Sequence, residues 1–117
     1  MNITGGGESH HEHTHSNSIV SGVWYPHTHE KLPPIQFLKD RDKSIELNVV
    51  NYNYYNNDSF LFPAKAGELL LFPSNMRHGV MSNKYDEKRI SLSFNTWVKG
   101  DLGDASRLTS LPIDRLI

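Results

Sequence analysis

The sequence contains no cysteine, which excludes a disulfide framework, a thiolate zinc site and a cysteine nucleophile. It has no apolar run long enough to cross a membrane, and its start lacks the charged and then apolar segments of a secretion signal. Neither sign of charge dominates, because 12 Lys and Arg stand against 13 Asp and Glu. Nucleic-acid-binding domains are usually strongly basic. We therefore expect a cytoplasmic protein with no nucleic-acid or membrane partner.

The order of short apolar segments and turn residues predicts an all-β protein. With 117 residues the chain has room for one core, so we expect a single domain over 1–117. Residues 1–9, with three consecutive glycines, are interpreted as a flexible lead-in. Strands are expected at 18–25, 35–38, 44–55, 59–63, 69–72, 78–81 and 89–98, and a helix only at 104–116. Short strands about ten residues apart, with turns between them, are typical of a sandwich or barrel.

Histidine is abundant near the start of the chain, at His10, His11, His13 and His15. Residues i and i+2 of a strand point to the same side, so His13 and His15 would aim two imidazoles at one point. A third nitrogen ligand, from His78 on a distant strand, would complete a site for Zn, Fe, Ni or Cu. The alternative is that HHEHTH is a mobile terminus or a tag remnant, although its interrupted pattern argues against a tag.

Two further features have both an ordinary and a functional interpretation. The pair His27 and His29 lies in a proline-rich loop and is interpreted as surface. The segment 89–98 alternates polar and apolar residues, so Arg89 and Ser91 either face solvent or face the same interior as His78. In the interior, the arginine fork can hold a carboxylate through two parallel hydrogen bonds, with a third from Ser91. Such an arginine beside a metal with open positions suits a keto-acid co-substrate.

Three blocks in order resemble a known family: HTHSNSIVSGVWY (13–25), AGELLLFPSNMRHGV (66–80) and KRISLSFN (88–95). They are similar to the signature blocks of small Fe(II)- and 2-oxoglutarate-dependent oxygenases, a prolyl-hydroxylase-like family of bacterial and phage type. The resemblance covers about residues 10–98, and KGDLGDASRLTSL (99–111) resembles the ends of bacteriophage members. It implies a double-stranded β-helix, the cupin-like jelly roll. Few residues precede His13, so we expect a truncated N-terminal edge, and an unpaired edge favours a homodimer.

The resemblance also implies a ligand set and an activity. Metal ligands fall on His13, His15 and His78, and the far carboxylate of 2-oxoglutarate falls on Arg89, with Ser91 and Tyr25 assisting. Phe72 and Pro73 resemble the strand end that positions the loop of the last histidine. The implied enzyme uses Fe(II), 2-oxoglutarate and O2, has no catalytic residue beyond the ligands, and hydroxylates a peptidyl (prolyl-like) or small-molecule substrate with release of succinate and CO2. Candidate substrate rims are 26–34 and 51–58, and the expected location is the cytoplasm of a bacterial or phage-infected cell.

One departure from the family pattern keeps alternatives open. Most such oxygenases use His-x-Asp, whereas His15 stands at the carboxylate position here, so His10, His11 or Glu12 could replace a ligand. A cupin-type metal protein that does not use 2-oxoglutarate is the first alternative. Against this alternative, the sequence lacks the glutamate that cupins have soon after the histidine pair, and it has Pro-Ser-Asn (73–75) in place of their Pro-x-Gly. A cupin would also give Arg89 no role. A non-enzymatic jelly-roll module with an incidental histidine-rich arm is the second.

Overall fold

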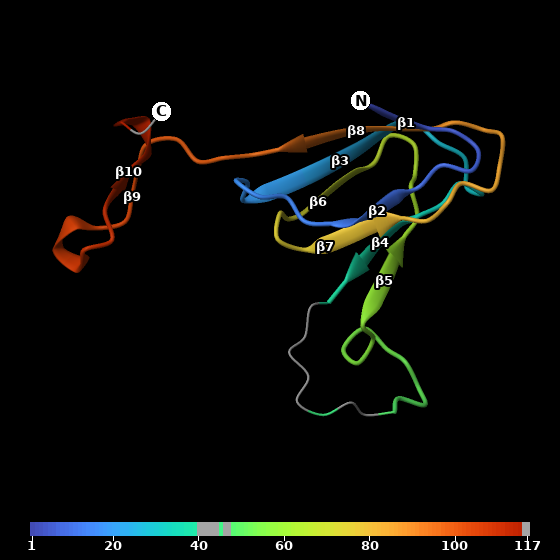
Figure 1. Cartoon of the computed structure of the whole chain (residues 1–117), viewed down its shortest axis with the longest axis horizontal. Coiled ribbons are helices and arrows are strands. Elements are labelled where there is room, and N and C mark those ends of the chain that lie inside the picture. Colours follow the sequence, from blue (N-terminus) through green and yellow to red (C-terminus); the bar gives the residue numbers. More distant parts are fainter. Residues whose placement is uncertain (40–44, 46–47, 116–117) are drawn as a thin grey trace.

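The computed structural model describes residues 1–39, 45 and 48–115, and it is all-β, as expected. Eight strands form two antiparallel four-stranded sheets that face each other (Figure 1). This strand order is consistent with the jelly roll, or double-stranded β-helix, implied by the resemblance. The first sheet contains β1 (Asn2–Thr4), β8 (Arg89–Asn95), β3 (Val20–His27) and β6 (Leu69–Pro73), in that order. The second contains β2 (His10–His13), β7 (Arg77–Val80), β4 (Ile35–Leu38) and β5 (Ser59–Phe62).

The core lies between the two sheets and is built from alternate residues of their strands. Inward positions on β3 hold Val23 and Tyr25, and those on β4 hold Ile35 and Phe37, all buried. Side chains alternate across a strand, so the neighbouring residues of β3 point away from this core. The expected strands at 18–25, 35–38, 59–63, 69–72, 78–81 and 89–98 correspond to β3 to β8 within a few residues.

Two expectations for the first residues of the chain were wrong. Residues 1–9 are not a free lead-in, because β1 pairs with β8 in the register Asn2–Ser91 to Thr4–Arg89. Thr4 is buried, and its side-chain oxygen lies 2.9 Å from Nε2 of His10. Gly7 adopts the left-handed φ of 82° in the turn that follows, where its N–H donates to the Asn83 carbonyl. The edge expected to be missing is therefore occupied by β1.

The strand expected at 44–55 is absent from the described part of that segment, since 48–55 forms bends and turns. Residues 44, 46 and 47 lie outside the described residues. The reason is local: Oδ1 of Asn53 accepts from the N–H groups of Tyr55 and Asn56 at 2.8 and 3.2 Å. Such side-chain bonds offer the backbone an alternative to a sheet.

The tail forms an arm that projects from the end of β8, well away from the two sheets (Figure 1). The expected helix is replaced by two 3-10 turns, at Ala105–Arg107 and Ile113–Arg115, and by the short pair β9 (Asp101–Leu102) and β10 (Leu111–Pro112). Leu108 has a left-handed φ of 57°, which ends the first turn. Among the described residues, no helix is long and apolar enough to cross a membrane.

Candidate metal and co-substrate site

The three histidines expected to bind metal meet at one end of the second sheet. His13 on β2 lies directly opposite His78 on β7, and His15 follows just after β2. One ring nitrogen from each of the three lies within 4.8 Å of the others. The structure thus brings together residues from two distant parts of the chain. The expectation that His13 and His15 share one strand was wrong, because β2 ends at His13 and the N–H of His15 donates to the Ser74 carbonyl in the β6–β7 turn.

The separation of two of these nitrogens matches a shared metal ion. Nε2 of His15 lies 3.2 Å from Nε2 of His78, and their rings stack with centroids 5.0 Å apart. Two nitrogen ligands that are each about 2.1 Å from one ion have this spacing when they subtend an angle of about 100°. The distance between the two nitrogens is therefore compatible with a shared divalent metal ion.

Two of the imidazoles are oriented by the carbonyl two residues earlier in their own chain segment. Nδ1 of His13 lies 2.8 Å from the His11 carbonyl oxygen, and Nδ1 of His78 lies 2.8 Å from that of Met76. A carbonyl oxygen only accepts, so each Nδ1 carries the proton and donates it. The unprotonated Nε2 is then free to bind metal, which is the usual arrangement around metal-bound histidines.

Burial keeps two of the rings in the neutral form that a metal needs. It lowers the pKa of His15, an effect that nearby His13 reinforces and a side-chain hydrogen bond to Asn95 opposes. It also lowers the pKa of His78, against the opposing hydrogen bond to the Met76 carbonyl. Metal ions bind neutral imidazole, so these shifts prepare the site for binding.

The turn between β6 and β7 positions two of the three histidines. The resemblance assigned the strand end at Phe72 and Pro73 to the loop of the last histidine, but it did not predict the contact with His15. The Ser74 carbonyl accepts from the His15 N–H at 2.9 Å, and the Met76 carbonyl accepts from His78. A cluster of hydroxyl groups holds the turn itself in place: Oγ of buried Ser74 lies 2.6 Å from Ser18 Oγ and 2.8 Å from Ser21 Oγ. The serines of the blocks 13–25 and 66–80 were the available signal.

Arg89 faces the interior, as the functional interpretation required. It is 2 % exposed, and Ser91, two residues further along β8, is also buried. Nε of Arg89 donates to the Pro33 carbonyl at 3.2 Å, and Nη2 donates to the hydroxyl of fully buried Tyr25 at 3.1 Å. The polar side of β8 therefore points between the sheets, and its apolar side points outward.

The charge of Arg89 has no acidic partner in the described parts of the chain. Its contacts there are a carbonyl, a phenol and the face of the Tyr25 ring, 5.0 Å from the guanidinium carbon. Burial lowers the pKa of Arg89, while Tyr25 opposes the shift. An arginine nevertheless stays charged in a protein, and a buried unpaired charge is costly. The arrangement fits a site completed by an anion.

A cavity of about 160 Å³ connects the histidines with the polar side of β8. Its lining includes His13, His15, His78, Ser91 and Ser93. The volume equals that of about five water molecules in the liquid, enough for a small co-substrate.

The alternative ligands are not part of this cluster. Within the described residues, the group of side chains able to hold a metal contains only His13, His15 and His78. Nε2 of His10 is engaged with Thr4, and exposed Glu12 lies 3.9 Å from Nε of Arg77. His11 is exposed as well.

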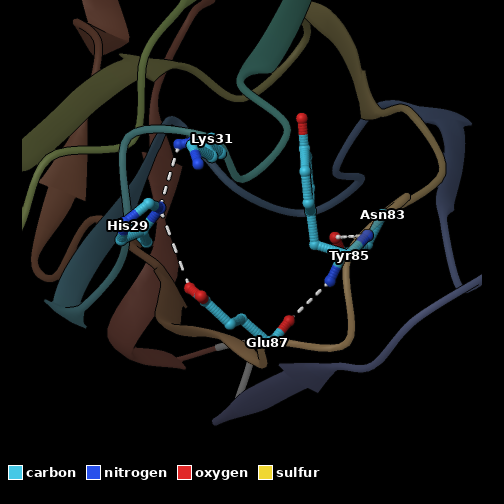
Figure 2. A network of polar contacts seen from close by, with 5 residues as sticks. All are labelled: His29, Lys31, Asn83, Tyr85 and Glu87. Carbon is cyan, nitrogen blue, oxygen red and sulfur yellow. Dashed lines mark hydrogen bonds and ion pairs between the residues drawn. The ribbon is translucent and has the colours of Figure 1, made fainter.

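The pair His27 and His29 lies on the surface, as expected. Nδ1 of His29 lies 3.7 Å from a carboxylate oxygen of Glu87 and accepts from the N–H of Lys31 (Figure 2). In the same network, the Asn83 side chain donates to the Glu87 carbonyl and accepts from the Tyr85 N–H. These contacts join the β3–β4 and β7–β8 loops and have no part in the metal cluster.

The all-β fold is consistent with a jelly roll, and its candidate site combines three clustered histidines with a buried arginine. A family model described as "Putative 2OG-Fe(II) oxygenase" matches residues 1–95. The chain belongs to this 2-oxoglutarate- and Fe(II)-dependent oxygenase family. The match confirms the resemblance drawn from the three sequence blocks, and the family implies Fe(II) and 2-oxoglutarate as cofactor and co-substrate. No curated protein matches the chain.

Proposed function

We propose that the protein is an Fe(II)- and 2-oxoglutarate-dependent dioxygenase that hydroxylates its substrate and releases succinate and CO2. The observation that carries the proposal is a cavity shared by the clustered histidines and Ser91 of β8. Arg89 is buried two residues before Ser91 on the same side of that strand, although it does not itself line the cavity. The cupin alternative explains the histidines alone and leaves the buried charge of Arg89 without a role.

The protein's own residues have three roles in this reaction. Nε2 atoms of His13, His15 and His78 would hold the iron, and the Nδ1 contacts of His13 and His78 keep those two rings in place. Arg89 would hold the far carboxylate of 2-oxoglutarate, with Ser91 beside it. When bound, iron and 2-oxoglutarate together supply the oxidation by O2 that inserts oxygen into a substrate C–H bond.

The Tyr25 hydroxyl has a specific part in anion binding. It accepts one hydrogen bond from Arg89, so its own proton is free to be donated to a carboxylate. Burial raises the pKa of Tyr25, against the opposing effects of Arg89. The phenol consequently stays protonated and able to donate at neutral pH.

Aromatic side chains shield the metal cluster on one side. The rings of Phe72 and Phe37 lie 4.7 and 5.9 Å from that of His78 and 4.9 Å from each other, measured between centroids. Exclusion of water by such a wall strengthens the electrostatic interactions of the site and limits side reactions.

We further propose a peptidyl, prolyl-like, or small-molecule substrate with an apolar group next to the reacting carbon. A second cavity of about 340 Å³ is lined by Phe37, Tyr54, Phe60, Phe62 and Phe72, among others. Phe72 also lines the metal cavity, so the two spaces share a wall. Tyr54 comes from the segment 51–58, which supports that segment as a substrate rim. The loop 26–34 instead meets the site through the Pro33 carbonyl, which holds Arg89.

The decisive experiment is an anaerobic titration with Fe(II) and then 2-oxoglutarate, followed by visible absorption. We expect a weak charge-transfer band that depends on 2-oxoglutarate and is lost in His78→Ala. Tight iron binding without the band would favour the cupin, and no tight iron would favour the non-enzymatic module. Proline-containing peptides can then be screened for gain of one oxygen by mass spectrometry.

A further inference from the structure

The first sheet presents a continuous apolar surface on the side away from the core. In the pairing register, Leu71, Gly22 and Phe94 lie in one row across β6, β3 and β8, and Leu69, Trp24 and Leu92 lie in the next. We call this surface the outer face; it consists of Ile3, Trp24, Leu69, Leu71, Leu92 and Phe94. Each of these side chains is between 40 and 60 % exposed.

Two features keep the apolar side chains of the first sheet on its outer face. Gly22 lies beneath the ring of Phe94, and a Cβ at that position would clash with the ring. The inward residues of the same strands include Ser21, Ser91 and Arg89, which the site requires. The apolar residues of β8 are therefore confined to the outside. Large contiguous apolar patches on a protein surface mark interaction sites.

The arm, residues 97–115, is the second surface without a partner. Its hydrogen bonds include contacts within itself, such as Gly100 N–H to Asp114, and its projection is plain in Figure 1. It exposes Trp97, Leu102, Leu111 and Leu108, the last of which is 96 % exposed. The radius of gyration is 18.1 Å, against about 13 Å for a globular domain of this length.

The chain exposes more surface than a compact monomer of its mass. Its accessible surface is 8805 Å², about 2300 Å² more than the roughly 6500 Å² expected, and the outer face and the arm contribute to this excess together with exposed side chains such as Tyr52 and Tyr55. Standard interfaces bury about 800 Å² per partner, and obligate dimers bury more. Because the outer face and the arm belong to the same chain, two copies related by a two-fold axis can each supply what the other lacks.

We propose that the outer face is the interface with a second copy of this chain, and that the partner's arm packs against it. The partner completes the surface of the first sheet, which on its inner side carries Arg89, Ser91 and Tyr25. The interface uses the flat of the sheet, in contrast to the edge pairing from which a homodimer was first expected. This proposal does not depend on the metal or on 2-oxoglutarate.

Sedimentation velocity over a range of protein concentrations tests the proposal with the full chain. We expect a dimer whose dissociation constant rises at least about tenfold in Trp24→Glu and in Leu92→Lys, as for central interface residues. Leu108→Lys should weaken the dimer by a similar factor if the arm is part of the interface. Leu61→Lys is the matched control, because Leu61 is 53 % exposed on β5 of the other sheet and Leu92 is 43 % exposed.

Circular dichroism and cobalt binding should show that each variant still folds. A wild-type chain that stays monomeric at every concentration would overturn the proposal. A dimer that the Leu61 variant disrupts as strongly as the Leu92 variant would place the interface elsewhere. A dimer sensitive to Trp24→Glu and insensitive to Leu108→Lys would overturn the role of the arm.

Discussion

The side-chain nitrogens of His15 and His78 lie 3.2 Å apart although 63 residues separate them in the chain. The two histidines are held there by one turn, whose Ser74 and Met76 carbonyls accept from the His15 backbone and the His78 ring. The metal cluster is consequently a product of the β6–β7 connection as much as of the strands themselves.

Removal of His78 is expected to abolish metal binding. His78→Ala leaves two of three nitrogen ligands. Loss of even a hydrogen-bond partner of a ligand costs about 10- to 100-fold in metal affinity, so isothermal titration with Co(II) or Fe(II) under anaerobic conditions should show affinity reduced by at least about a hundredfold. His29→Ala, on the surface, is the control and should bind metal normally. Retained affinity in His78→Ala would show that the metal lies elsewhere.

Substitution of Arg89 is expected to separate metal binding from co-substrate binding. Arg89→Ala should keep metal affinity but raise the 2-oxoglutarate requirement, because truncating one side of a buried charge pair costs about 2–5 kcal/mol. That range corresponds to about 30-fold or more in the dissociation constant. The measurement is the 2-oxoglutarate dependence of the charge-transfer band, with exposed Arg107→Ala as the control. An unchanged dependence would remove Arg89 from the site.

Loss of the Tyr25 hydroxyl is expected to have a smaller effect in the same direction. Tyr25→Phe keeps the ring that packs in the core and removes one hydrogen-bond partner of Arg89, worth about 0.5–1.5 kcal/mol. The 2-oxoglutarate dissociation constant should rise about 2- to 13-fold, with metal affinity unchanged. If Tyr25→Phe equalled Arg89→Ala, the hydroxyl would carry the whole interaction and the assignment to arginine would be wrong.

The inner and outer phenylalanines of the first sheet should differ sharply in their contribution to stability. Phe72 is buried between Phe37 and His78, so Phe72→Ala should lower the free energy of unfolding by about 3–5 kcal/mol. Phe94→Ala removes a ring from the outer face, and in a dissociated chain it should cost much less. Urea denaturation at low protein concentration measures both. Equal losses would mean that Phe94 is part of the core.

The clustering of the three histidines was predictable because short sequence blocks carry them. His13, His15 and His78 were assigned from spacing and resemblance, and the structure brings them together. The orientation of Arg89 could not be decided from alternation. The apolar side of a strand usually faces the core, whereas here the polar side of β8 faces the interior and the apolar side faces outward. The burial of Arg89 and Ser91, beside exposed Leu92, shows which side of β8 points inward.

The errors arose where local hydrogen bonds or distant pairing outweigh composition. Three glycines suggested a free start, yet β1 gains its order from β8, far along the chain. Asn53 and Asn56 lie in a segment with strand-like residues but bond to the nearby backbone. The helix expected in the tail was wrong because Gly103 and Leu108 take left-handed conformations.

The reliance of His13 and His78 on main-chain carbonyls has a consequence for how the sequence can vary. Any amino acid supplies a backbone carbonyl oxygen, so residues 11 and 76 can change identity. The number of residues in each of these segments cannot change, because an insertion or deletion would move the carbonyl away from the histidine ring. A saturation library of the turn 74–76, selected for cobalt binding, should accept many side chains at positions 75 and 76 and reject every insertion or deletion. The geometry of the histidine cluster would then depend on the number of residues in the turn, a property that a residue-by-residue comparison of distant relatives does not register.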